Sequence, residues 1–240
     1  MALGTSRMVV AIMCVQALGL TGCALPDRWP AGWATGPGAF QDLTRELSSR
    51  QQTVLCLTTA EQLARDGHLR EAILLYEKAR QSDPRATDYP RRLAPLYAQT
   101  GDLVQAAAEF HTALAASPKD ANLWNDAACL ELRRGNLRQA ESLLRQALEA
   151  DPQHLHAHAN LGLLLARQGR LAEAFELFQA ALGPAAAHTN LAVVLAEQGQ
   201  IDLAREAVAR ALACDPHLPQ ARALAERLPS AGTREPPPRR

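Results

Sequence analysis

The sequence predicts an all-α protein, a solenoid of repeated helical hairpins, and two observations carry this prediction. First, four glycines recur at intervals of 34 residues and a fifth follows after 30: Gly67, Gly101, Gly135, Gly169 and Gly199. A fixed period of this length is typical of proteins whose repeating unit is a pair of helices. Second, 48% of the residues are hydrophobic but only 4% are aromatic. Alanine and leucine must therefore supply the core, which favours close helix packing over a sheet sandwich.

The residues around each glycine repeat in the same frame. Small residues lie seven positions before it (Ala60, Ala94, Ala128, Gly162, Ala192), five positions after it (Ala72, Ala106, Ala140, Ala174, Ala204) and twelve positions after it (Ala79, Ala113, Ala147, Ala181, Ala211). Small side chains let the two helices of a hairpin approach closely. The larger residue nine positions after the glycine is expected to fill the space against a neighbouring hairpin.

Glycine and proline predict where the helices end. The glycines permit a tight turn, including positive φ, between the two helices of each hairpin. A proline follows seventeen positions later in four of the five units and ends the second helix: Pro84, Pro118, Pro152 and Pro216. In the fourth unit Leu182-Gly183-Pro184 ends that helix four residues early. Pro95 falls inside the first helix of the second unit, so we expect that helix to be bent or to start late.

This pattern resembles the tetratricopeptide repeat (TPR) family, whose fold is a right-handed α-solenoid of helix-turn-helix units. Five units align, at residues 53–86, 87–120, 121–154, 155–184 and 185–218. We expect a lead-in helix at 39–52 and a C-terminal capping helix at 219–228, with Ala221, Leu224, Ala225 and Leu228 on one face, because terminal repeats need a cover. The polar, proline-rich residues 229–240 are predicted to be disordered.

The N-terminal residues have the features of a targeting signal. An apolar run from Met8 to Leu20 follows Arg7 and is too short to span a bilayer as a helix. Leu20-Thr21-Gly22-Cys23 then has the layout of a cleavable signal. It resembles the bacterial lipoprotein signal, which implies a signal peptide at 1–22, lipidation of Cys23, and a flexible lipid-bearing tether at 23–38. An ordinary signal peptide is the alternative.

Charge and motifs exclude several classes of function. Lys+Arg and Asp+Glu both number 25, so no net charge favours nucleic acid. No phosphate-binding, dinucleotide-binding or nucleophile-elbow motif is present. We therefore expect a protein that is not an enzyme and uses no cofactor.

Histidine and cysteine are interpreted as structural. In the run His154, His156 and His158 only the outer two could converge on a helix, and no carboxylate or cysteine completes a zinc set. Packing and surface roles are favoured over a metal site. Cys56, Cys129 and Cys214 lie in alternate units, too far apart for a disulfide, and are expected to be core thiols.

The family resemblance implies a binding groove lined by the first helix of each hairpin. The residues that it places there are Arg65, Arg91, Asn125, Arg133, Asn160, Arg167 and Asn190. Arginines and asparagines can bind carboxylates and backbone carbonyls. The Lys/Asn carboxylate clamp of chaperone-type members is not reproduced in order, so that ligand is not implied. A solvated polar face is the alternative.

Together these features predict a scaffold or adaptor that binds protein or peptide segments. The resemblance to TPR lipoproteins, among them pilotins and Tad-type pilus-assembly proteins, implies a place in the bacterial cell envelope, lipid-anchored on the outer side of the cytoplasmic membrane. Two alternatives stay open: a metal-binding or enzymatic module using His154, His156 and His158, and a cytoplasmic chaperone-like adaptor. The outer membrane stays open as the site of the anchor. Partner, pathway, host and oligomeric state do not follow from the sequence.

Overall fold

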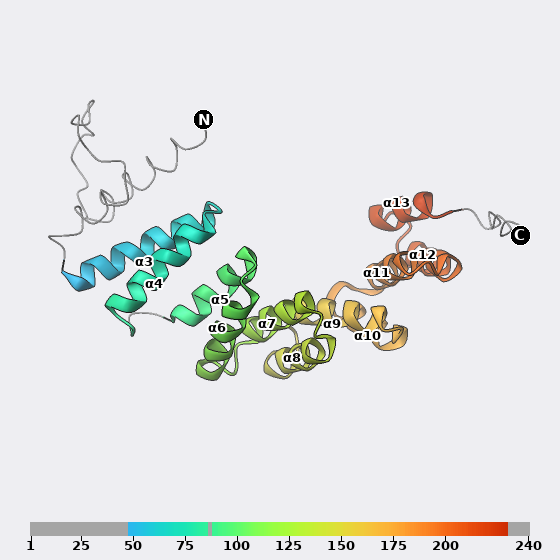
Figure 1. Ribbon diagram of the computed structural model, residues 1–240. Helices are drawn as coiled ribbons and strands as arrows, with labels where there is room; N and C mark the ends of the chain where they lie inside the picture. The colour runs from blue at the N-terminus through green and yellow to red at the C-terminus, as the bar shows by residue number, and fades with distance from the viewer. Residues whose placement is uncertain (1–47, 86–87, 230–240) are drawn as a thin grey trace, which may run out of the picture. The chain divides into compact units, whose positions relative to one another are not determined.

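The computed structural model describes residues 48–85 and 88–229, and these form helices joined by short turns (Figure 1). The helices are α3 (Ser49–Arg65), α4 (Leu69–Ser82), α5 (Tyr89–Thr100), α6 (Leu103–Ala116), α7 (Ala121–Arg134), α8 (Leu137–Ala150), α9 (Leu155–Arg167), α10 (Leu171–Leu182), α11 (Pro184–Glu197), α12 (Ile201–Cys214) and α13 (Pro219–Arg227). No strand occurs in these two ranges. The predicted all-α solenoid class is confirmed.

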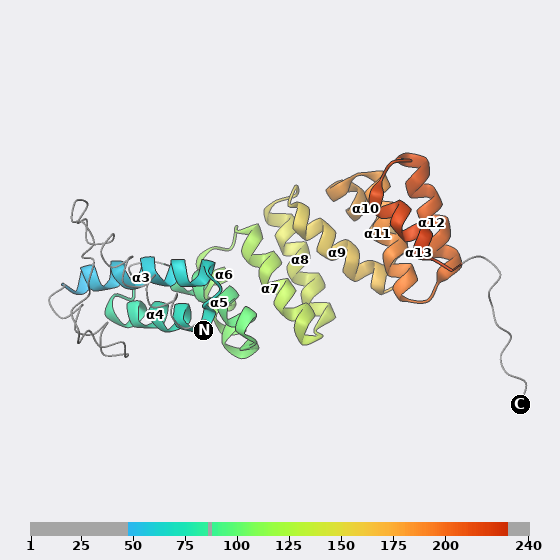
Figure 2. The ribbon, with the colours of Figure 1, turned by 90° about the horizontal axis from the view of Figure 1, so that it is seen from above.

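The chain divides into two compact units, one ending at Ala113 and one beginning at Leu114. The first unit holds the hairpin α3–α4, then α5 and most of α6. The second holds the hairpins α7–α8, α9–α10 and α11–α12, whose members pack against each other and are seen as pairs from two directions (Figures 1 and 2). Helix α13 packs on α12 and α11, as expected of a capping helix.

The turn glycines behave as predicted. Gly67, Gly101, Gly135, Gly169 and Gly199 all have positive φ, between +74° and +91°. The shortened fourth unit is also present, because α10 has 12 residues where α8 and α12 have 14. Gly183 ends it with φ +83°. Pro184 belongs to the next hairpin, where it is the first residue of α11.

Small residues form the helix crossings, as the repeat predicts. Ala128, Ala140, Ala174 and Ala192 have no exposed surface. At Gly162 the approach is closest, because a Cβ atom there would lie 3.0 Å from two ring carbons of Phe178 and 3.3 Å from the carbonyl oxygen of Ala174. In this hairpin the Phe178 ring therefore lies where a Cβ atom at position 162 would be.

The turns between hairpins share one pattern, an aspartate whose side chain accepts a backbone hydrogen bond. Asp83, Asp151 and Asp215 end their helices in extended conformation, and each accepts a hydrogen bond from the amide two residues ahead. The proline between the two residues cannot continue the helix. Side-chain-to-backbone bonds of this kind favour turns over helix.

Three expectations need correction. For α5, where a bend or a late start was expected, the late start is wrong, since Tyr89–Thr100 is helical with Pro95 inside it, and the bend stays a prediction. Ala225 does not join the buried face of α13 but is exposed, whereas Ala221 is buried and Leu224 and Leu228 pack on the core. Cys214 is exposed rather than a core thiol, because it lies at the solvent side of the last turn of α12.

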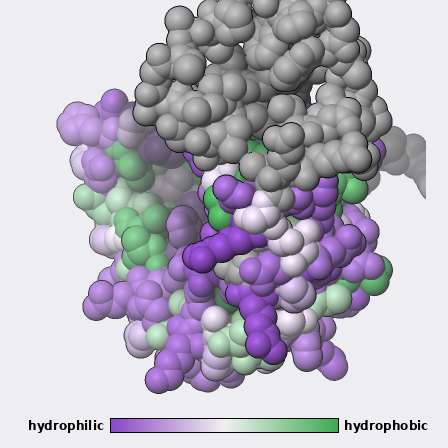
Figure 3. Space-filling view, turned by 90° about the vertical axis from the view of Figure 1, so that its left-hand side faces the viewer, coloured by the Kyte–Doolittle hydropathy of each residue, from purple (hydrophilic) through white to green (hydrophobic). Residues whose placement is uncertain are grey.

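The N-terminal predictions lie outside the described residues: the signal peptide, Cys23, the tether and residues 39–47 of the lead-in helix. So does the tail from residue 230. Residues 49–52 form the start of α3, capped by Ser48 and Gln51 in a reciprocal capping box. In the part of the chain with assigned structure, no helix has the length and apolarity needed to cross a membrane. Where Figure 3 colours the described residues, most of the visible surface is hydrophilic.

Candidate functional site

The first helices of the second unit, α7, α9 and α11, lie side by side and share one face. Asn160 Nδ2 on α9 donates a hydrogen bond to Asn125 Oδ1 on α7 at 2.8 Å. On the other flank, Arg167 Nη2 lies 3.3 Å from Glu197 Oε2 on α11. Gln198 Nε2, which follows α11, donates to the backbone oxygen of Arg167 at 3.0 Å. These contacts define what we term the first-helix face.

Three rows of side chains cross the first-helix face. The polar row lies early on the helices and contains Asn125, Asp126, Asn160 and Asn190. The middle row lies one turn later and contains Cys129, Leu163 and Val193, of which Val193 is 40% exposed. The charged row lies at the helix ends and contains Arg133, Arg167 and Glu197, all exposed. The face therefore offers amides, then apolar surface, then mainly guanidinium groups.

The polar row is partly shielded from water. Asp126 keeps an exposed side chain, yet its recessed position desolvates the carboxylate and raises its pKa, against the opposing effect of a hydrogen bond from Asn125 at 3.3 Å. Burial, with a smaller contribution from Asp126, also raises the pKa of the Cys129 thiol. Asn160 Nδ2 contacts that sulfur at 3.5 Å. A thiol with a raised pKa is a poor nucleophile, so Cys129 supplies surface rather than chemistry.

The structure places every predicted groove residue on a first helix. Asn125, Arg133, Asn160, Arg167 and Asn190 lie together in the second unit, and the contacts above join α7 to α9 and α9 to α11. Arg65 on α3 and Arg91 on α5 lie in the first unit, and both are exposed. Arg92, next to Arg91, is the residue that forms an ion pair with Glu61 of α3.

Sequence reasoning missed the middle row and Asp126. The signal was available, because Cys129, Leu163 and Val193 each lie six positions before a turn glycine, in register with Glu61 of the first unit. None of the three is a charged or amide residue, so a search for repeated polar residues passes over them.

His154 and His158 of the histidine run form hydrogen bonds within the fold. His154 caps α9, where its Nδ1 accepts from the amide of Ala157 at 3.0 Å, and its Nε2 contacts Asn122 Oδ1 at 3.1 Å. His158 Nε2 contacts the carbonyl oxygen of Pro152, as Trp124 Nε1 does with Pro118 one repeat earlier. No group of three metal-ligating side chains is found within residues 48–85 and 88–229.

One detail of the histidine prediction was wrong. His154 and His156 were expected to diverge, but their rings contact edge-on with centroids 6.0 Å apart. The reason is that His154 precedes the helix in extended conformation, so helical spacing does not apply to it.

Comparison with known proteins identifies the repeat. A family model described as tetratricopeptide repeat matches residues 57–121, 125–187 and 183–219, well over half of the chain. The chain belongs to the tetratricopeptide repeat family. No curated protein matches this TPR chain.

Solved TPR structures share the fold at low identity. A TPR protein from Parabacteroides merdae is 18% identical, with a TM-score of 0.62 over 74% of this chain and 72% of that one. YrrB, described as a TPR protein with an unusual peptide-binding site, is 22% identical, with a TM-score of 0.56 over 78% and 98%. MamA is 16% identical, with a TM-score of 0.58 over 75% and 98%. The TPR fold supports a role in protein–protein interaction.

Proposed function

We propose that this TPR protein is a membrane-anchored scaffold that holds an extended segment of a partner protein on its first-helix face. The observation that carries the proposal is the continuous face made by α7, α9 and α11. The Asn160–Asn125 hydrogen bond joins α9 to α7, and the Arg167–Glu197 ion pair joins α9 to α11. Its three rows suit the three parts of a peptide: backbone amides, side chains and acidic groups.

The chemistry of each row supports this assignment. Carboxamides donate and accept at once, so the partly exposed Asn160 and Asn190 can pair with the alternating groups of a peptide backbone. Asn125 is buried, and its amide positions Asn160 by accepting a hydrogen bond from it. The middle row supplies apolar area around Leu163 and Val193. Arginine binds carboxylates through paired N–H groups, so the end of the face that holds Arg133 and Arg167 favours an acidic residue or a chain terminus.

The likeness to YrrB supports peptides as the ligand class, since that protein is described by its peptide-binding site. No residue role is transferred from it. We place the partner in an envelope, secretion or pilus-type assembly, because the N-terminal sequence resembles that of a lipoprotein.

Reversing the two arginines of the face tests the binding proposal. The double variant Arg133→Glu/Arg167→Glu should recover almost no partner in pull-downs, because each charged hydrogen bond contributes about 1.5–3 kcal/mol where water is partly excluded. Thermal stability should change little, since both side chains are exposed.

The matched control is Arg138→Glu/Arg210→Glu, which reverses two exposed arginines on the second helices α8 and α12 of the same unit. The control should recover the partner as the unaltered protein does. Equal recovery by both double variants would place binding elsewhere.

A separate substitution tests the anchor. Cys23→Ser should abolish acyl labelling and move the protein from the membrane to the soluble fraction, because acyl chains contribute about 0.8 kcal/mol per buried methylene. Metabolic labelling with a fatty acid and membrane fractionation measure both effects. Persistent labelling of the serine variant at full membrane retention would exclude Cys23 as the anchor.

A further inference from the structure

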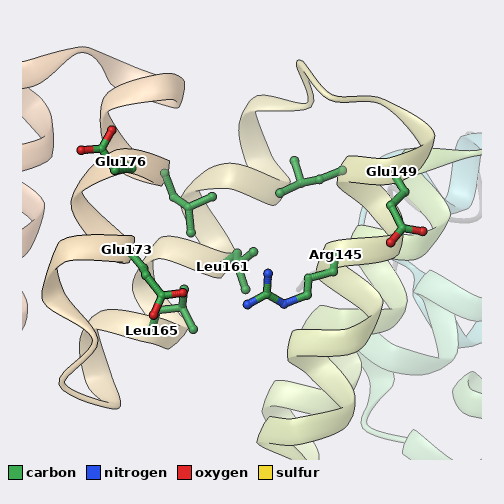
Figure 4. A pocket seen from close by; sticks show the side chains of 8 residues that line it. Arg145, Glu149, Leu161, Leu165, Glu173 and Glu176 are labelled. Carbon is green, nitrogen blue, oxygen red and sulfur yellow. The ribbon is translucent and has the colours of Figure 1, made fainter.

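A recess lies on the other side of the second unit, between the second helices α8 and α10. It has a volume of about 460 Å³ and contains Leu148, Leu161, Leu165 and Leu177 (Figure 4). The two leucines from α9, Leu161 and Leu165, are buried in the core. None of the residues lining this recess belongs to the first-helix face. It is therefore a separate surface with an apolar lining.

A chain of ion pairs joins the two walls of the recess. Arg145 and Arg170 both donate to Glu141 Oε1 at 2.8 Å, and Arg170 also binds Glu173 at 2.6 Å. The hydrogen bond from Arg145 is the largest cause that lowers the pKa of Glu141. These contacts neutralise Arg145, Arg170 and two of the carboxylates against one another.

The remaining charge on the recess is acidic. Glu149 and Glu176 come from opposite walls, and both are exposed. Glu149 accepts a hydrogen bond from the neutral side chain of Gln146 at 3.1 Å. The walls and the ion-pair chain together carry four carboxylates (Glu141, Glu149, Glu173, Glu176) against two guanidinium groups. An apolar recess with excess negative charge complements a segment that is both apolar and basic.

The same arrangement recurs one hairpin later. A second recess of about 480 Å³ lies between α10 and α12, with Phe175, Leu195 and Leu203 in its lining. Leu203 is 46% exposed. Glu206 and Arg210 both line this recess and form an ion pair with each other at 2.6 Å, which leaves Glu176 as the remaining acid of its lining. Glu176 lines both recesses, so α10 is their common wall.

We propose that these two recesses form a docking site for a basic amphipathic helix of a partner protein. Two of its leucine-like side chains, seven residues apart, fill the recesses, and its lysines or arginines contact Glu149 and Glu176. The spacing fits, because seven residues of helix rise about 10.5 Å and the common wall has the width of a helix, about 10–12 Å. The residues between the two leucines then lie over Glu176.

A designed probe tests the proposal in isolation from any natural partner. The probe is a capped, fluorescein-labelled peptide of 14 residues, the length of α8, with leucines seven apart, lysines beside them and alanine elsewhere. Fluorescence anisotropy measures its binding to the full chain. We expect saturable binding that weakens as salt is raised, and no binding by versions with Leu→Ser or Lys→Glu.

Variants of the protein then locate the probe. Glu149→Arg/Glu176→Arg should weaken binding at least about tenfold, whereas Asp202→Arg/Glu226→Arg, which reverses two exposed acids outside the recesses, should stay within about twofold. Melting curves check that each variant is folded. The proposal is overturned if the probe does not bind, or if the Glu149/Glu176 variant is folded and binds it normally. It is also overturned if reversal of Arg133 and Arg167, rather than of the two glutamates, releases the probe.

Discussion

Replacing Gly162 with leucine should lower the free energy of unfolding by about 2 kcal/mol. Even the Cβ of an alanine would meet the Phe178 ring at 3.0 Å and the Ala174 carbonyl oxygen at 3.3 Å. Overpacking a core costs about 1–3 kcal/mol and the crowding here is severe, while the gain in helix propensity over glycine returns less than about 1 kcal/mol. For a chain of this size the loss corresponds to a fall in melting temperature of about 4–8 °C.

Thermal denaturation followed by circular dichroism measures the effect. The matched control is Ala180→Leu, which adds similar bulk at an exposed position on α10 and should leave the melting temperature nearly unchanged. A Gly162→Leu protein that melts with the unaltered chain would mean that α9 and α10 are not as close as described.

The second large effect is expected at Arg80, where reversal to glutamate should cost about 2–3 kcal/mol. Arg80 Nη1 donates to Glu109 at 2.7 Å, and Nη2 donates to Glu77 at 2.6 Å. The Glu109 side chain is only 10% exposed. Glutamate at position 80 would leave that carboxylate without its cation and bring a third negative charge beside it, and breaking a fully buried pair costs about 3–5 kcal/mol. Partial exposure of Arg80 reduces the figure.

Chemical denaturation of the two variants Arg80→Glu and Arg210→Glu compares the stability lost at a half-buried ion pair with that lost at an exposed one. Arg210 occupies an exposed ion pair with Glu206 at 2.6 Å, with both side chains more than half exposed. Such pairs contribute between about 0 and 1 kcal/mol, so its reversal should barely move the denaturation midpoint. Equal midpoints for the two variants would contradict the half-buried network around Arg80.

That contrast marks the limit of sequence reasoning for side chains. The repeat puts Arg80, Arg145 and Arg210 on second helices, thirteen, ten and eleven residues after a turn glycine, but does not distinguish the half-buried Arg80 from the exposed Arg210. They differ because Glu109 reaches Arg80 from the next hairpin. A contact across 29 residues depends on packing between repeats, which the pattern within one repeat does not describe.

The fold was predictable because the same helix-turn-helix pattern recurs in every repeat. Glycine at the turn, small residues at the crossings and proline after the second helix are backbone and volume requirements, and five copies average out exceptions such as Pro95. The repeat also explains the exposure of Cys214, because Ser82 and Ala116, which like Cys214 lie fifteen positions after a turn glycine, are exposed as well. Ala225 lies on the capping helix, to which the repeat pattern does not apply.

The binding face was predictable only in part. The arginines and asparagines were identified because their types recur, and the structure joins Asn160 to Asn125 across 35 residues. Asp126 and the middle row were missed because their types vary. The recesses beside α10 escaped notice because their leucines are, by sequence, ordinary core residues. Only the three-dimensional spacing of the second helices reveals the space between them.

The central claim is that a partner lies on the first-helix face, and site-specific photo-cross-linking in cells tests it most directly. A benzophenone amino acid at Val193, an exposed position in the middle row, should form a covalent adduct with the partner, detected by mass spectrometry. The same group at Ala225, an exposed position on α13 outside both the face and the recesses, should not, and Arg133→Glu/Arg167→Glu should remove the Val193 adduct. Adducts from Ala225 with none from Val193 would contradict the account.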